Sequence, residues 1–130
     1  MREILFRGIA KTDGQRWKRG QWVSGDLVRL QDGNDGKPHI YGYGEVFPET
    51  VGQYTGICDK NGRKIFEGDI IVIRDGGIVR NYVVEYEEGT TAYYANDCDK
   101  KVIGFKRLVD ENSDEYEVIG NIYDNSNLIE

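Results

Sequence analysis

The sequence has few of the residues that usually build metal, redox or nucleophile sites. Its 130 residues include two cysteines, Cys58 and Cys98, and one histidine, His39. Two cysteines are too few for a disulfide framework, and with one histidine they fall short of a usual four-ligand zinc site. We therefore expect reduced cysteines used in packing, a partly buried or surface histidine, and no bound metal or cofactor.

Long apolar runs are missing as well. The chain starts MREILFRGIAKTDG, with an acid at position 3, which does not fit a secretory signal. No later segment approaches the roughly 20 apolar residues of a membrane-spanning helix. These features predict a cytoplasmic protein that does not use a membrane.

Helical periodicity and phosphate-binding glycine loops are nearly absent, whereas strand signals are frequent. The glycines fall in turn-like DG, NG and DGG steps rather than in GxxxxGK[ST] or GxGxxG patterns. Segments rich in Val, Ile, Tyr and Phe predict strands at 3–7, 21–30, 39–46, 69–74, 78–86, 101–109 and 115–123.

Short connections between so many strands favour an all-β protein, with a small SH3-like or coiled β-barrel. We expect at most one short helix, in FPETVG at 47–52, where Pro48 could take the first helical position. The length suits a single compact domain over 1–130, which could comprise two β lobes at about 1–53 and 54–130.

The stretch GICDKNGRKIFEGDIIVI, residues 56–73, allows a site or a hairpin. As a site, it would offer acids for metal binding or acid–base catalysis and bases to hold an anion: Asp59, Glu67, Asp69, Lys60, Arg63 and Lys64. A calcium loop starting at Asp59 is excluded, because Gly62 and Ile70 then occupy positions 4 and 12 rather than glycine at 6 and glutamate at 12.

The hairpin interpretation explains more of this stretch. Asp59 to Gly62 has the residues of a type I turn closed by a left-handed glycine. Asp69 enters a second turn, with Glu67 solvated at its lip. The pattern of residues 65–71 also occurs at 22–28, and in both we expect the Gly-Asp step to make a tight turn with a positive glycine φ.

Other acids occur in pairs, Glu85 with Glu87 on one strand face and Glu115 with Glu117. A metal-dependent hydrolase using Glu85, Glu87 or Asp69 is left open. A solvated sheet face is the favoured interpretation, so no catalytic residue is assigned.

Charge is divided unevenly along the chain. Residues 1–30 carry seven Lys/Arg against three Asp/Glu, and residues 31–130 carry ten against twenty. Aromatic rings lie near the basic region and could stack on bases while cations contact phosphates: Trp17, Trp22, Tyr41 and Tyr43 with Arg16, Lys18 and Arg19. The same division would allow copies of the chain to pair head to tail.

Three motifs together resemble the YopX-like family of phage and prophage proteins. They are ILFRG followed by GQWVSGDLV, then PETVGQYTGICDKNGRKIFEGDIIVI, then EVIGNIYDNSNLIE at the end. The resemblance implies a mostly β fold, a mobile-element origin and hence the cytosol of a bacterial host. It implies no catalytic residue.

These observations favour a non-enzymatic phage accessory protein. We expect a homo-oligomer that acts as an assembly or binding module for a host or phage protein, since many strand edges are available for pairing. The alternative hypothesis is a nucleic-acid-binding module that uses the basic N-terminal region.

Overall fold

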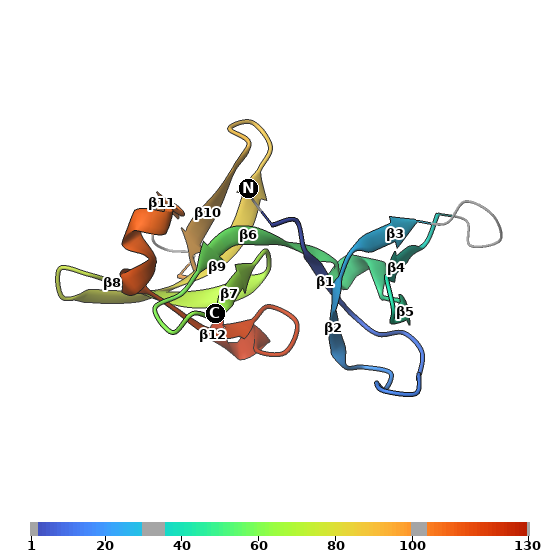
Figure 1. Ribbon diagram of the computed structural model, residues 1–130. Coiled ribbons are helices and arrows are strands. Elements are labelled where there is room, and N and C mark those ends of the chain that lie inside the picture. Colours follow the sequence, from blue (N-terminus) through green and yellow to red (C-terminus); the bar gives the residue numbers. More distant parts are fainter. Residues whose placement is uncertain (1–2, 30–35, 100–103, 130) are drawn as a thin grey trace. The chain divides into compact units, whose positions relative to one another are not determined.

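A computed structural model of the chain describes residues 3–29, 36–99 and 104–129 (Figure 1). The described residues form β-strands and short 3₁₀ segments, so the predicted all-β class is confirmed. The chain divides into two compact units, residues 1–54 and 55–130. Strand β6 (Gly52–Cys58) starts in the first unit and ends in the second.

The first unit contains small antiparallel sheets. Its other elements are β1 (Phe6–Ile9), β2 (Trp22–Gly25), β3 (Leu27–Arg29), β4 (Pro38–Ile40), β5 (Gly44–Glu45) and the 3₁₀ segment η1 (Pro48–Thr50). Strand β1 pairs with β2 and with the start of β6, and β4 pairs with β3 and β5. Four buried side chains form the core of this unit: Ala10, Val23, Ile40 and Val46.

The prediction of one continuous strand at 39–46 is wrong for the middle of that segment. A turn at residues 41–43 separates β4 from β5, and Gly42 and Gly44 have φ angles of 88° and 84°. The alternation of side chains requires continuous extended backbone, which this turn interrupts. Tyr41 is therefore 74% exposed, whereas Tyr43 packs against the core, and the two rings do not share a strand face.

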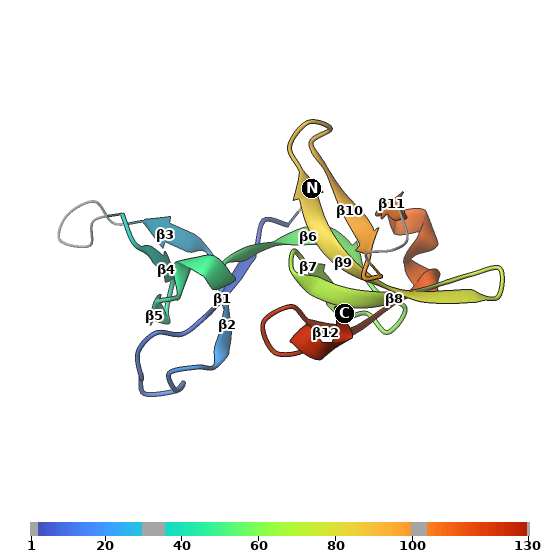
Figure 2. The same ribbon diagram turned by 180° about the vertical axis from the view of Figure 1, so that it is seen from behind.

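The second unit is built on a five-stranded antiparallel sheet. Its elements are the end of β6, β7 (Lys64–Phe66), β8 (Asp69–Asp75), β9 (Ile78–Glu87), β10 (Ala92–Asp97), β11 (Phe105–Arg107), η2 (Asp110–Glu115), β12 (Tyr116–Asn121) and η3 (Ser126–Leu128). The order in the sheet is β11-β10-β9-β8-β12. The strands curl into a half-barrel, which is visible from both sides (Figures 1 and 2).

The two faces of this sheet have different coverings. The inner face carries the main core, which includes Ile71, Tyr82, Val84 and Tyr93. On the outer face, the C-terminal segment packs Ile122, Leu128 and Ile129 against Ile70, Val83 and Cys98. The outer face therefore has a covered part over β8 and β9, while its continuation toward β11 presents exposed side chains.

Several elements differ from the sequence expectations. The predicted strand at 21–30 is split into β2 and β3, and its Leu30 lies outside the described residues. Of the predicted strand 101–109, residues 105–107 form β11 and 101–103 lie outside the described residues. The expected helix at 47–52 is the 3₁₀ segment η1 with Pro48 at its start. Strands β6 and β7 were predicted only as the arms of the hairpin in 56–73, and η2, η3 and β10 were not predicted.

Candidate functional site

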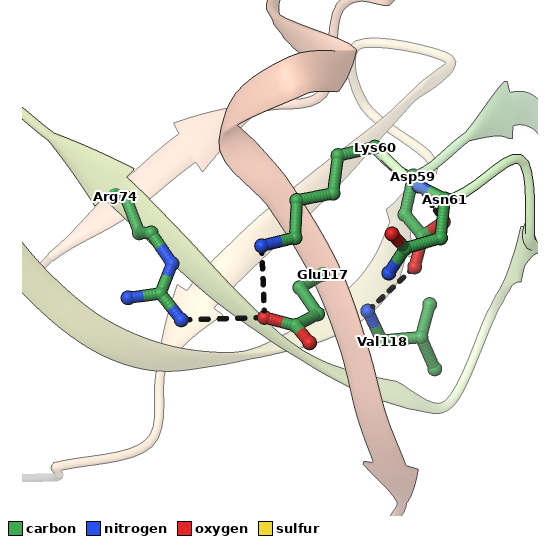
Figure 3. Close-up of polar contacts among 6 residues, drawn as sticks. All are labelled: Asp59, Lys60, Asn61, Arg74, Glu117 and Val118. Atoms are coloured by element: carbon green, nitrogen blue, oxygen red, sulfur yellow. Dashed lines mark hydrogen bonds and ion pairs between the residues drawn. The ribbon is translucent and has the colours of Figure 1, made fainter.

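Asp59 holds the turn between β6 and β7 to strand β12. Its Oδ1 accepts hydrogen bonds from the backbone N–H groups of Asn61 and Arg63, both at 2.9 Å. Its Oδ2 accepts one from the N–H of Val118 at 3.0 Å, which Figure 3 shows. Burial by itself raises the pKa of Asp59, but the three N–H donors and the charge of Arg63 together lower it below its usual value. The hairpin interpretation of this stretch is confirmed, with a left-handed Gly62 at φ 80°.

Lys60, which could have held an anion, contacts a carboxylate of its own chain. Its Nζ lies 3.4 Å from Oε1 of Glu117, and Nη2 of Arg74 lies 3.2 Å from the same oxygen (Figure 3). The hydrogen bonds from Arg74 and then from Lys60 lower the pKa of Glu117. The cluster thus joins the turn after β6, strand β8 and strand β12. Arg63 and Lys64 are exposed.

The two Gly-Asp steps differ in structure. Gly68 has a φ of 91°, and the 1%-exposed Asp69 accepts a 2.7 Å hydrogen bond from the N–H of Phe66 at Oδ2, as predicted for a tight turn. The prediction is wrong at the other step, because Gly25 has no positive φ and Asp26 is exposed. A Cβ at Gly25 would lie 3.2 Å from Cγ2 of Ile40, so close packing accounts for that glycine. Glu67 is half-buried rather than solvated.

The remaining acids do not assemble into a recognisable catalytic group. Glu85 and Glu87 lie at alternate positions of β9 and are exposed, as expected. Glu115 ends η2 while Glu117 lies in β12, so this pair does not share a strand. Among the described residues, no group of three or more His, Cys, Asp or Glu side chains is placed to hold a metal ion.

Most of the rings considered for base stacking are used in packing. The rings of Trp17 and Tyr43 meet edge to face with centroids 5.4 Å apart, and Trp17 Nε1 donates to the carbonyl oxygen of Thr12 at 3.0 Å. The Arg7 guanidinium lies 4.6 Å from the ring centroid of Trp22. Tyr41 is the exposed member of the set, and it lies in the turn after β4.

The cysteines and the histidine occupy ordinary positions. Cys58 is half-buried and Cys98 is buried, and both are free thiols. Burial raises the pKa of Cys98, followed in effect by the nearby Asp97 charge, which keeps this thiol protonated. His39 is partly buried in β4, with Nδ1 3.0 Å from the carbonyl oxygen of Lys37.

A pocket that sequence reasoning missed lies where the outer face of the second unit is not covered by the C-terminal segment. Its volume is about 310 Å³. The pocket combines aromatic rings, carboxylates and neutral polar groups: Glu85, Tyr86, Glu87, Thr90, Tyr94, Asn96 and Phe105.

Strand pairing explains how these residues meet. Glu85 of β9 is opposite Tyr94 of β10, and Asn96 of β10 is opposite Phe105 of β11, so all four point to one face. The rings of Tyr94 and Phe105 meet edge to face at 5.9 Å. Phe105 is nevertheless 65% exposed, an unusual position for a large apolar ring.

The two exposed carboxylates in this pocket lack a counterion in the described part of the chain. Glu85 forms neither an ion pair nor a side-chain hydrogen bond there, and Glu87 accepts only a 3.4 Å hydrogen bond from the N–H of Gly89 at its carboxylate. The pocket is therefore negatively charged and apolar at once, a combination suited to a cationic side chain with an aliphatic stem.

Comparison with family models shows the family of this chain. A family model described as YopX protein matches residues 10–130, which is most of the chain and includes every residue of the pocket. The chain belongs to the YopX family. No curated protein matches the sequence.

The closing motif that resembles this family is structural. A Cβ on Gly120 would lie 2.4 Å from Oδ1 of Asn125, and the same oxygen accepts a hydrogen bond from the N–H of Asn121 at 3.1 Å. Gly120, Asn121 and Asn125 of this motif thus form the turn after β12. Separately, none of the helices in the described ranges has the length and apolar character needed to cross a membrane.

Proposed function

We propose that this YopX-family chain is a non-enzymatic protein-binding module, and that the pocket formed by β9, β10 and β11 is its binding surface. The observation that carries the proposal is the 65%-exposed Phe105 ring beside the unpaired Glu85 carboxylate in a pocket of about 310 Å³. An exposed aromatic anchor with polar neighbours is typical of the centre of a protein interface.

The charge of the second unit supports a protein partner over a nucleic acid. Residues 55–130 carry nine Lys/Arg against sixteen Asp/Glu, a net charge of −7. A phosphate backbone would be repelled by the carboxylates at the pocket. The partner is a host or phage protein in the bacterial cytosol that presents basic and apolar side chains.

The acids of residues 56–73 favour a binding role over catalysis. Asp59 and Asp69 are buried, and their oxygens accept backbone hydrogen bonds that maintain turns. A general acid or base requires a carboxylate that can reach substrate and change protonation near the working pH. The lowered pKa of Asp59 keeps that carboxylate ionised instead.

Affinity capture tests this function. The tagged protein is incubated with bacterial lysate, with and without nuclease, and bound proteins are identified by mass spectrometry. We expect one stoichiometric protein that survives nuclease, is lost with Phe105→Ser and is retained with Ile78→Ser. Ile78 is a matched control, because it is 64% exposed and apolar but lies outside the pocket.

Two outcomes contradict the proposal. Bound material that disappears with nuclease would favour nucleic-acid binding through the basic N-terminal region. A captured protein that is retained equally by wild type and Phe105→Ser would place the interface elsewhere on the chain. Melting curves of both variants serve as the folding control, since each replaces an exposed side chain.

A further inference from the structure

The loop between β1 and β2 is held in a defined conformation by its own contacts. The N–H of Gly14 donates to the carbonyl oxygen of Trp17 at 2.9 Å, and the N–H of Arg19 donates to Oδ1 of Asp13 at 2.8 Å. Gly14 lies directly against the indole, since a Cβ there would come within 2.1 Å of the Trp17 ring. The packed indole of Trp17 fixes the loop on the core of the first unit.

This ordered loop presents two cations to solvent. Arg16 and Lys18 are exposed on either side of the packed Trp17, and in the described part of the chain neither side chain forms an ion pair. The loop backbone is already ordered by its internal hydrogen bonds. Binding through these cations therefore costs less conformational entropy than binding through a flexible tail.

The pocket of the second unit has the complementary chemistry. Glu85 and Glu87 are two exposed carboxylates at alternate positions of β9, on the same face as the rings of Tyr94 and Phe105. Alternate residues of a strand point to the same face roughly 7 Å apart. The two cations of the loop are opposite in charge to the two carboxylates of the pocket and equal to them in number, and the rings add cation–π attraction.

We propose that the Arg16–Lys18 loop of one copy docks into the Glu85–Glu87 pocket of a second copy of this chain. This inference rests on the proposed function, because it names one occupant of the same pocket. The contact is heterologous, so each copy offers one loop and one pocket, and repeated contacts produce a closed ring or an open chain of copies. A contact between one loop and one pocket buries little surface, so the association is weak and is populated at high protein concentration.

Charge exchange between two variants tests the self-association. The pocket variant carries Glu85→Lys and Glu87→Lys, and the loop variant carries Arg16→Glu and Lys18→Glu. Molar mass is measured by sedimentation equilibrium from about 10 µM to about 1 mM, the range in which weak interfaces become populated. We expect wild type to rise above the 14.9 kDa of one chain.

Each variant alone should associate about tenfold more weakly than wild type, because its loop and pocket then carry the same sign of charge. An equimolar mixture should recover association, since the basic loop of the pocket variant fits the acidic pocket of the loop variant, and the acidic loop fits the basic pocket. Raising the salt concentration should weaken wild-type association. Thermal melting confirms that both variants fold, as all four substituted side chains are exposed.

A molar mass of 14.9 kDa for wild type at every concentration would overturn the self-association, as would association that both variants retain. Failure of the mixture to associate would also overturn it. These results leave the proposed function intact if lysate capture still depends on Phe105. Conversely, self-association that follows the charge pattern without any Phe105-dependent partner in lysate would sustain this inference and contradict binding of another protein.

Discussion

At the scale of single residues, two buried aspartates accept hydrogen bonds from backbone N–H groups. Asp59 and Asp69 are 5% and 1% exposed, and each replaces a missing strand partner for nearby N–H groups. A buried carboxylate that accepts several N–H bonds stabilises the folded state as long as it stays ionised. The same residue types in the same motif could have formed a metal site, so geometry decides between the two roles.

Asp59→Asn should destabilise the protein by about 1–3 kcal/mol at neutral pH. The amide can still accept bonds from Asn61 and Arg63 through its oxygen, but its NH₂ would then face the N–H of Val118. Urea unfolding measures the loss. The control is Asp26→Asn, which removes an exposed carboxylate between β2 and β3 and should change stability by less than about 0.5 kcal/mol.

The stability difference between wild type and Asp59→Asn should depend on pH. Because the pKa of Asp59 is lowered in the folded state, its contribution is present above the ordinary aspartate pKa and is lost as the pH falls through the folded value. The difference should therefore be constant near neutral pH and shrink below about pH 4. An unchanged difference at pH 3 and below would show that the charge of Asp59 is not what stabilises the turn.

At the scale of elements, glycine conformation shapes the β6–β7 hairpin. Gly56 lies inside strand β6 with a φ of 88°. Next to it, Oγ1 of Thr55 accepts the N–H of Ile57 at 3.1 Å and donates to the carbonyl oxygen of Ile65 at 2.9 Å. The strand therefore bends at Gly56 as it approaches β7, and a side chain there would be strained.

Gly56→Ala should destabilise the protein by about 1–2 kcal/mol, because the left-handed backbone conformation costs an L-residue about this much free energy. Gly89→Ala is the matched control, since Gly89 has no positive φ and its nearest neighbour is the flexible end of Glu87 at 3.4 Å. Thermal melting of both variants compares the two sites. Equal melting temperatures for the two variants would contradict the assigned role of Gly56.

The sequence predicted those elements whose signal is local. The strands β8, β9 and β12 carry runs of Val and Ile, and the Asp59–Gly62 turn carries its own turn residues, so each was predicted near its observed place. Strand β10 was missed because AYYAND has two alanines and ends in turn-like residues. Its buried Ala92 and Ala95 fit because of neighbouring strands, which sequence propensity does not capture.

The pocket could not be predicted for the same reason. It needs three strands in register, so that Glu85 faces Tyr94 and Asn96 faces Phe105, and β10 supplies the middle row. Glu85 and Glu87 were correctly placed on one face of a strand, but nothing local in the sequence indicates their aromatic neighbours from β10 and β11. Long-range pairing, rather than residue type, makes this surface.

At the scale of the whole molecule, each of the two units has its own core. In the described part of the first unit, β1 to β5 have two to four residues each, and four buried side chains form the core. The second has strands of up to ten residues, and ten buried side chains of its described residues form the main core. Long strands with a hydrogen-bonded neighbour on each side open less readily than short ones.

Hydrogen exchange should reveal this difference. We expect the slowest amides in β8 and β9, which lie inside the five-stranded sheet, and faster exchange in β4, which has three residues. Exchange measured by mass spectrometry of peptides or by NMR resolves these strands. Amides of His39 and Ile40 that exchange as slowly as those of Ile71 and Val84 would contradict the expected ranking.

The central claim is that the pocket of the second unit is where a protein binds. The most direct measurement replaces Phe105 with a photoreactive phenylalanine analogue in the full chain, irradiates living bacterial cells and identifies adducts by mass spectrometry. The analogue at Ile78, an exposed position outside the pocket, is the control. We predict a discrete protein adduct from position 105 that position 78 does not give. The same adducts from both positions, or none from position 105, would contradict the account.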